Sequence, residues 1–185
     1  MYPYNYVKRA DAQTLANRMK YDGVTSSLIY GLQWDLVLKY IETKNLGQRS
    51  NLLSNSTAIG NYYNSEFILN RGKFAQYNVL ADWFDYNSEK KKELVTGSKK
   101  KTQSSNSNSI LLTTGATDAT KLQNIYDIAG NVREWTLEFF KDNEPCIARG
   151  GSCYCNGLDN PAVERDSNVY EHFSSYITFR VGLWK

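Results

Sequence analysis

The sequence has little of the side chains from which zinc and disulfide sites are built. Its 185 residues include one histidine, His172, and three cysteines, Cys146, Cys153 and Cys155. A zinc site of the usual composition is therefore not expected. The cysteines are odd in number and close together, which is a poor basis for a disulfide framework.

The sequence also lacks a long apolar segment and a large net charge. No apolar run approaches the ~20 residues of a membrane-spanning helix, and the first residues, MYPYNYVKRADAQ, lack the apolar core of a secretion signal. We expect that the chain either is not exported by that route or is one domain of a longer protein. The net charge of +3 gives no broad basic surface, so nucleic acid is not expected as a partner.

What is present predicts one α+β domain over residues 1–185, with two N-terminal helices followed by short antiparallel strands and long loops. Asp11 is expected to cap a helix ending near Tyr21. A second helix is expected over residues 31–44, because Trp34, Val37, Leu38 and Ile41 follow helical spacing. Short strands are expected at 66–69, 110–114, 124–128, 146–150 and 177–183, and residues 97–109 are expected to form a flexible polar loop.

Three motifs occur in a distinctive order, and they carry a family resemblance. They are NIYDIAGNVREW at 124–135, RGGS at 149–152 and TFR at 178–180. This order resembles the formylglycine-generating enzyme (sulfatase-modifying factor) family, whose members have an elaborated C-type-lectin-like fold. The resemblance implies that fold, with Arg149, Gly150, Gly151, Phe179 and Arg180 holding the scaffold and Trp34 and Trp135 anchoring the core.

The resemblance does not carry the family's copper chemistry with it. The enzymes hold copper with two cysteines, the second five residues after the first. Cys155 falls at the first of these positions, but Asn160 stands at the second. Cys153 would share a strand face with Cys155 if this segment were extended. Copper binding is therefore not expected, and no catalytic residue is assigned. The alternative is a copper-dependent oxidase or another redox enzyme that uses Cys155.

The resemblance also implies a structural calcium site around the G-N-V-x-E-W turn. Calcium prefers several oxygen ligands, including carboxylates and backbone carbonyls. The positions that match are the carboxylates of Asp127 and Glu134 and the carbonyls of Gly130 and Val132. The alternative is that Glu134 pairs inside the fold with Arg149 or Arg180.

The segment 153–176, CYCNGLDNPAVERDSNVYEHFSSY, has an unusual composition. It has no Lys, Gln, Met or Trp. Mutation of the adenines in an Asn codon gives Asn, Ser, Asp, Gly, Tyr, Cys, His and Phe, and diversity-generating retroelements mutate adenines in this way. Their variable proteins resemble lectin-fold relatives of the same family, with the variable stretch after R-G-G-S. The candidate ligand-binding residues are Cys153, Tyr154, Cys155, Asn156, Gly157, Asp166, Ser167, Asn168, Tyr170, His172, Phe173, Ser174 and Ser175.

This composition suits a binding surface, because tyrosine gives large, stiff contact area and Ser, Gly and Asn adapt their hydrogen bonds. We therefore expect a non-catalytic protein whose loops bind a protein or cell-surface ligand, on a phage particle or a bacterial cell surface. An oligomer is compatible with this interpretation. Two different hypotheses stay open at this point: a structural surface protein without variable loops, and a polar loop whose composition arose by chance.

Overall fold

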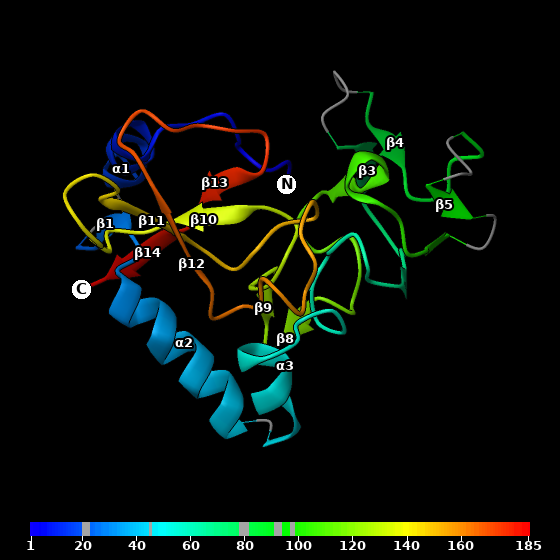
Figure 1. Ribbon diagram of the computed structural model, residues 1–185, viewed down its shortest axis with the longest axis horizontal. Helices are drawn as coiled ribbons and strands as arrows, with labels where there is room; N and C mark the ends of the chain where they lie inside the picture. Colours follow the sequence, from blue (N-terminus) through cyan, green and yellow to red (C-terminus); the bar gives the residue numbers. More distant parts are fainter. Residues whose placement is uncertain (20–22, 45, 78–81, 91–93, 97–98) are drawn as a thin grey trace.

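The computed structural model describes residues 1–19, 23–44, 46–77, 82–90, 94–96 and 99–185 (Figure 1). It has an α+β architecture with few helices and many short strands in small sheets. The helices are α1 (Arg9–Asn17), α2 (Gly31–Lys44) and α3 (Arg49–Leu53), with single 3-10 turns at Leu46–Gln48 and Asn106–Asn108. None of the helices in these ranges has both the length and the apolar character needed to cross a membrane.

The strands are two to four residues long. They are β1 (Thr25–Leu28), β2 (Phe67–Ile68), β3 (Lys73–Gln76), β4 (Phe84–Asp85), β5 (Val95–Thr96), β6 (Lys100–Lys101), β7 (Ile110–Leu112), β8 (Lys121–Leu122), β9 (Ile125–Tyr126), β10 (Arg133–Trp135), β11 (Cys146–Arg149), β12 (Arg165–Asn168), β13 (Ile177–Phe179) and β14 (Val181–Trp184).

The expected helices are present, but the first differs at both ends: it begins at Arg9 and ends at Asn17, before the expected end near Tyr21. Helix α2 has the predicted bounds and buries Trp34, Leu38 and Ile41. Helix α1 begins at Arg9, and its N-cap residue, Lys8, makes no side-chain capping bond. The prediction that Asp11 caps this helix is wrong: Asp11 lies inside the first turn, where its carboxylate interacts favourably with the helix dipole.

One sheet organises the C-terminal half of the chain, with strand order β12-β11-β10-β13. Three of its strands pair antiparallel, but β10 and β13 are parallel, contrary to the expectation of antiparallel strands throughout. The strand expected at 177–183 is interrupted at Arg180. Its first part, β13, joins this sheet, whereas its second part, β14, pairs with β1 in another.

The outcome of the loop prediction differs along residues 97–109. Residues 97 and 98 lie outside the described residues, and Lys100–Lys101 form β6, paired with both β2 and β5. Strand β12 likewise lies inside the segment expected to form variable loops, paired over four residues with β11. Sequence composition cannot indicate these strands, because their pairing partners are distant in the sequence.

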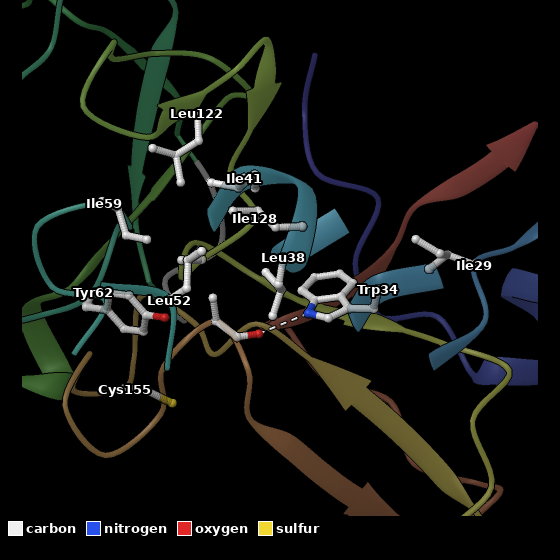
Figure 2. Close-up of a cluster of buried hydrophobic side chains, with 12 residues drawn as sticks. Ile29, Trp34, Leu38, Ile41, Leu52, Ile59, Tyr62, Leu122, Ile128 and Cys155 are labelled. Carbon is white, nitrogen blue, oxygen red and sulfur yellow. Dashed lines mark hydrogen bonds between the residues drawn. The ribbon is translucent and has the colours of Figure 1, made fainter. Parts of the chain in front are cut away.

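The largest hydrophobic cluster lies where α2 and α3 meet the loops that follow β9 and β11 (Figure 2). Trp34 is fully buried, and its indole N–H donates to the carbonyl of Ala162 at 3.0 Å. Tyr62 lies in the same cluster and donates its hydroxyl to the carbonyl of Gly150 at 3.0 Å. Side chains of the N-terminal half therefore hold the segment 150–162 in place.

A ring of four charged groups joins α2 to the sheet. Arg149 is fully buried, with its guanidinium 5.8 Å from the centre of the Trp34 ring. It donates one nitrogen to Glu138 at 2.8 Å and another to Asp35. Arg165 donates to the second oxygen of each of the same carboxylates, at 2.6 Å in both cases. The ring thus ties together α2, β11, β12 and the segment after β10.

A second buried cation, Lys101, is paired with backbone carbonyls. Its ammonium donates to the carbonyls of Tyr62, Tyr63 and Ser65, in the last two cases at 3.3 and 2.7 Å. Burial lowers the pKa of Lys101 to about 7. The expectation that this lysine belongs to a solvated loop is wrong, since it holds the turn after Tyr62 instead.

We expect Lys101→Met to destabilise the fold more than Lys100→Met. The first change removes hydrogen bonds to buried carbonyls and costs about 1–3 kcal/mol for each polar group left unsatisfied. Lys100 is half-exposed and pairs with Glu66, and an exposed pair contributes only about 0–1 kcal/mol. Urea unfolding measures both free energies of unfolding. An equal loss in the two variants would contradict the structural role of Lys101.

Candidate functional site

The frame of the candidate binding segment is the Arg-Gly-Gly-Ser turn that follows β11. Gly150 and Gly151 have φ values of +93° and +68°, a region in which residues with a Cβ are strained. A Cβ on Gly151 would lie 2.4 Å from the carbonyl oxygen of Asn160, so a side chain has no room there. The Gly150 carbonyl also accepts from the Gly130 amide at 2.7 Å. Backbone contacts therefore require both glycines.

The cysteines after this turn point into the protein, not toward solvent. The chain turns at 152–155, where the Cys155 amide donates to the Ser152 carbonyl at 3.0 Å. Cys153 packs with Leu111 and Val132, whereas Cys155 belongs to the hydrophobic cluster of α2. The prediction that the two cysteines share a strand face is wrong, because the segment is a turn. Neither is available for ligand contact in this conformation.

Two further candidate contact residues are also buried. A Cβ on Gly157 would lie 2.5 Å from the backbone nitrogen of Thr57, and Ser175 is only 7% exposed. The interior side of the segment thus comprises Cys153, Cys155, Gly157 and Ser175. The other candidates are partly or fully exposed: Tyr154, Asn156, Asp166, Ser167, Asn168, Tyr170, His172, Phe173 and Ser174.

Among the exposed candidates, Asn156 has a local structural role. Its side-chain oxygen accepts from the Leu158 amide at 2.8 Å and from the Asn64 side chain at 3.0 Å. Such a turn shapes the backbone and engages the side-chain oxygen of Asn156. Tyr170 and Phe173, in contrast, are exposed aromatic side chains. The Arg9 guanidinium lies 6.0 Å from the Tyr170 ring centre, on the side of α1.

Four rings form an aromatic face, which we define as Tyr77, Tyr154, His172 and Tyr176. Tyr154 stacks on Tyr176 with ring centres 6.1 Å apart and planes inclined by 12°. Tyr77 lies 5.1 Å from Tyr154, and His172 lies 6.4 Å from Tyr176. Burial raises the pKa of the Tyr77 hydroxyl to about 12. The structure thus brings together two residues that were expected at the site, Tyr154 and His172. It adds two that were not expected there, Tyr77 and Tyr176.

Arg133 lies against the aromatic face, and the sequence motif that contains it gave it no role. Its guanidinium is 5.4 Å from the Tyr176 ring centre, within ion-pairing distance of Asp166 at 3.5 Å and Glu164 at 3.6 Å. Burial raises the pKa of the Glu164 carboxyl. The nearby charge of Arg133 lowers this pKa, but by less than burial raises it. Arg133 is brought here by the parallel pairing of β10 with β13, a long-range contact without a local sequence signal.

One of the expected calcium ligands, Glu134, forms an internal ion pair. Arg180 donates to both carboxylate oxygens of Glu134, at 2.8 and 2.7 Å, and to the carbonyl of Tyr126 at 3.0 Å. Burial raises the pKa of Glu134, and Arg180 acts in the opposite direction. The alternative in which Glu134 pairs with Arg180 is confirmed.

Asp127 is similarly occupied. Its two oxygens accept from the Thr120 hydroxyl at 2.7 Å and the Gly115 amide at 3.1 Å. Within the described ranges, no group of three or more His, Cys, Asp and Glu side chains is placed to hold a metal ion. Both carboxylates of the set Asp127, Gly130, Val132 and Glu134 thus accept from protein donors in this arrangement, and a structural calcium there stays a prediction.

A pocket of about 410 Å³ opens beside this ion pair. Asp127, Glu134 and Arg180 contribute polar groups, and Tyr4 and Phe179 are among its apolar walls. The rings of Tyr4 and Phe179 meet edge to face with centres 6.0 Å apart. The sequence motifs did not indicate this pocket, because the N-terminal segment forms one of its walls.

Comparison of the chain with protein-family models, with curated proteins and with solved structures found no match. The resemblance to the formylglycine-generating enzymes therefore depends on the short motifs alone.

The burial of the cysteines predicts low thiol reactivity. Burial raises the pKa of Cys153 to about 12, and the neutral thiol is a poor nucleophile. We expect native protein to react with Ellman's reagent about tenfold or more slowly than protein unfolded in guanidinium. Absorbance of the released thiolate measures both rates. Rapid reaction of one or two thiols in the native protein would mean that the segment 152–155 is open to solvent.

Proposed function

We propose that this chain is a non-catalytic ligand-binding protein with a C-type-lectin-like fold related to the formylglycine-generating enzymes. Its ligand contacts would come from the outward side of the segment 153–176, diversified by a retroelement. One observation carries the proposal: the segment combines buried anchors with exposed Tyr and Phe and partly exposed His, Asp, Ser and Asn side chains on a fixed frame. Such a division lets outward residues change without loss of the fold.

The frame supports this proposal because backbone pairing and buried contacts hold most of it in place. Strand β12 is held by backbone pairing with β11 over four residues. The segment before it is fixed by the buried Ala162, whose amide donates to the Ser56 hydroxyl at 2.8 Å. Binding residues on loops supported by a rigid scaffold are a common arrangement in recognition proteins.

The chemistry of the outward side favours a protein ligand, on a phage particle or a cell surface. Tyr154 and Tyr170 offer amphipathic area with few rotatable bonds, and Ser and Asn side chains adapt to polar groups on a partner. The stacking of Tyr154 on Tyr176 limits the motion of the first of these rings, which lowers the entropy lost on binding.

A pair of matched mutant libraries tests whether the outward side chains of the segment 153–176 can change while the buried ones cannot. One library places Asn, Ser, Asp, Gly, Tyr, Cys, His and Phe at four outward positions, the exposed Tyr154 and Tyr170 and the partly exposed Ser167 and Ser174. The other places the same residues at the buried positions Cys153, Cys155, Gly157 and Ser175. Displayed clones are challenged with protease. Survival should be at least about tenfold higher in the first library, because disrupted core packing costs about 2–5 kcal/mol.

The surviving clones of the first library are then selected on an immobilised probe protein, for which lysozyme is suitable. We expect binders whose affinity is lost when the selected side chains are returned to alanine. Equal survival of the two libraries, or the absence of binders, would count against a display function. The gene's neighbourhood is an independent test: a reverse transcriptase beside a near-copy of the segment encoding 153–176 is expected, and its absence would overturn diversification.

A further inference from the structure

Helix α2 carries an apolar stripe on the side that faces away from the core. Leu32, Leu36 and Tyr40 are 71%, 59% and 47% exposed. They are spaced by four residues, so they lie on one helix face over successive turns. Figure 1 shows α2 along one margin of the molecule, with the other elements on one side of it. Single exposed apolar residues are common, but three in a row form a surface that marks an interaction site.

The stripe is not required by the fold. The core side of α2 is provided by Trp34, Leu38 and Ile41, all of them buried. Leucines at two outward positions therefore leave apolar area in water without any gain within the chain. This observation concerns a different surface from the aromatic face, and it does not depend on the proposed ligand-binding function.

We propose that α2 is a self-association surface, on which a second copy of this chain packs its own α2 in antiparallel orientation. A two-fold axis at Leu36 places this residue against its counterpart and Leu32 near Tyr40 of the other copy. Rows of residues spaced by four are the ridges that interlock in the commonest class of helix packing. A closed two-fold contact of this kind uses the same patch on both copies.

Charge along the helix fits an antiparallel pair. Asp35 and Lys39 flank the same side of the stripe. Within the chain Asp35 pairs with Arg149 and Arg165 and Lys39 pairs with Glu42, but the two side chains stay 39% and 66% exposed. The two-fold axis brings Lys39 of each copy close to Asp35 of the other. In a parallel pair, Asp35 of one copy would lie near Asp35 of the other, and Lys39 near Lys39. The antiparallel arrangement also opposes the two helix dipoles favourably, and a net charge of only +3 per chain gives little repulsion.

The size of the surface indicates a weak, reversible dimer. A helix of 14 residues is about 21 Å long at 1.5 Å per residue, so its contact falls short of the roughly 800 Å² per partner of a standard interface. We therefore expect association at micromolar or higher concentration, not an obligate dimer.

Sedimentation equilibrium over a range from about 1 μM to 1 mM tests this proposal, with Leu36→Glu as the disrupting variant. The wild-type mass should rise from the 21.2 kDa of one chain toward twice that value. Leu36→Glu should remain monomeric, because it places two carboxylates against each other. The matched control is Leu158→Glu, at a leucine with a similar exposure of 58%, which should associate as the wild type does. Circular dichroism confirms that both variants fold.

Orientation is tested by comparing Leu36→Cys with Leu32→Cys. The antiparallel pair brings the two Leu36→Cys thiols together and keeps the two Leu32→Cys thiols apart, because Leu32 lies near Tyr40 of the other copy. Leu36→Cys should therefore form a disulfide-linked dimer under mild oxidation, whereas Leu32→Cys and Leu158→Cys should not. A wild-type protein that is monomeric over the whole range would overturn the proposal. So would association that survives Leu36→Glu, or cross-linking of Leu32→Cys or Leu158→Cys that is as fast as that of Leu36→Cys.

Discussion

The buried guanidinium of Arg149 is the constraint on which the arrangement of this protein depends. A fully buried arginine is tolerated only when its charge is compensated nearby, because removing a charge from water costs several kcal/mol. Asp35 and Glu138 supply that compensation, and Arg165 balances the second carboxylate charge. Each carboxylate comes from a different part of the chain, so α2, the end of β10, β11 and β12 have to be positioned together. The hydrophobic cluster supplies cohesion, but these directional contacts determine which segments become neighbours.

The two glycines after Arg149 let the chain turn sharply out of strand β11 into the C-terminal segment. Because Gly150 and Gly151 adopt positive φ values, the chain leaves the sheet and passes over the cluster of α2, where Cys155 and Ala162 are buried. It returns to the sheet as β12, guided by the pair between Arg165 and Asp35. The segment therefore has an inner side dictated by packing and an outer side that packing leaves free. The proposed binding function would thus use other residues of this stretch than those that stabilise the fold.

The sequence predicted those features whose physical cause is local. Helical spacing identified the buried face of α2, and the order of short apolar runs located strands such as β7 and β11. The inward orientation of Cys153 and Cys155 was missed because alternation along a strand does not apply inside a turn. Lys101 was assigned to a solvated loop since nothing in its neighbourhood reveals the carbonyls around Tyr62 that it contacts. Arg133 was missed for a similar reason, as parallel pairing of distant strands places it beside Tyr176.

The two proposed surfaces are compatible in one particle. Figure 1 places the loop that follows β12 beside α1, whereas α2 lies along another margin of the molecule. Two copies joined through α2 would leave both of these loops uncovered and hold them at a fixed separation. Linked sites bind a repetitive surface more tightly than either site alone, since the second contact forms at a high effective concentration. A weak dimer can thus strengthen attachment to a surface that repeats its ligand. It requires no change in the individual contacts. Under the proposed diversification, every variant of the outward side chains would gain from the same pairing of α2.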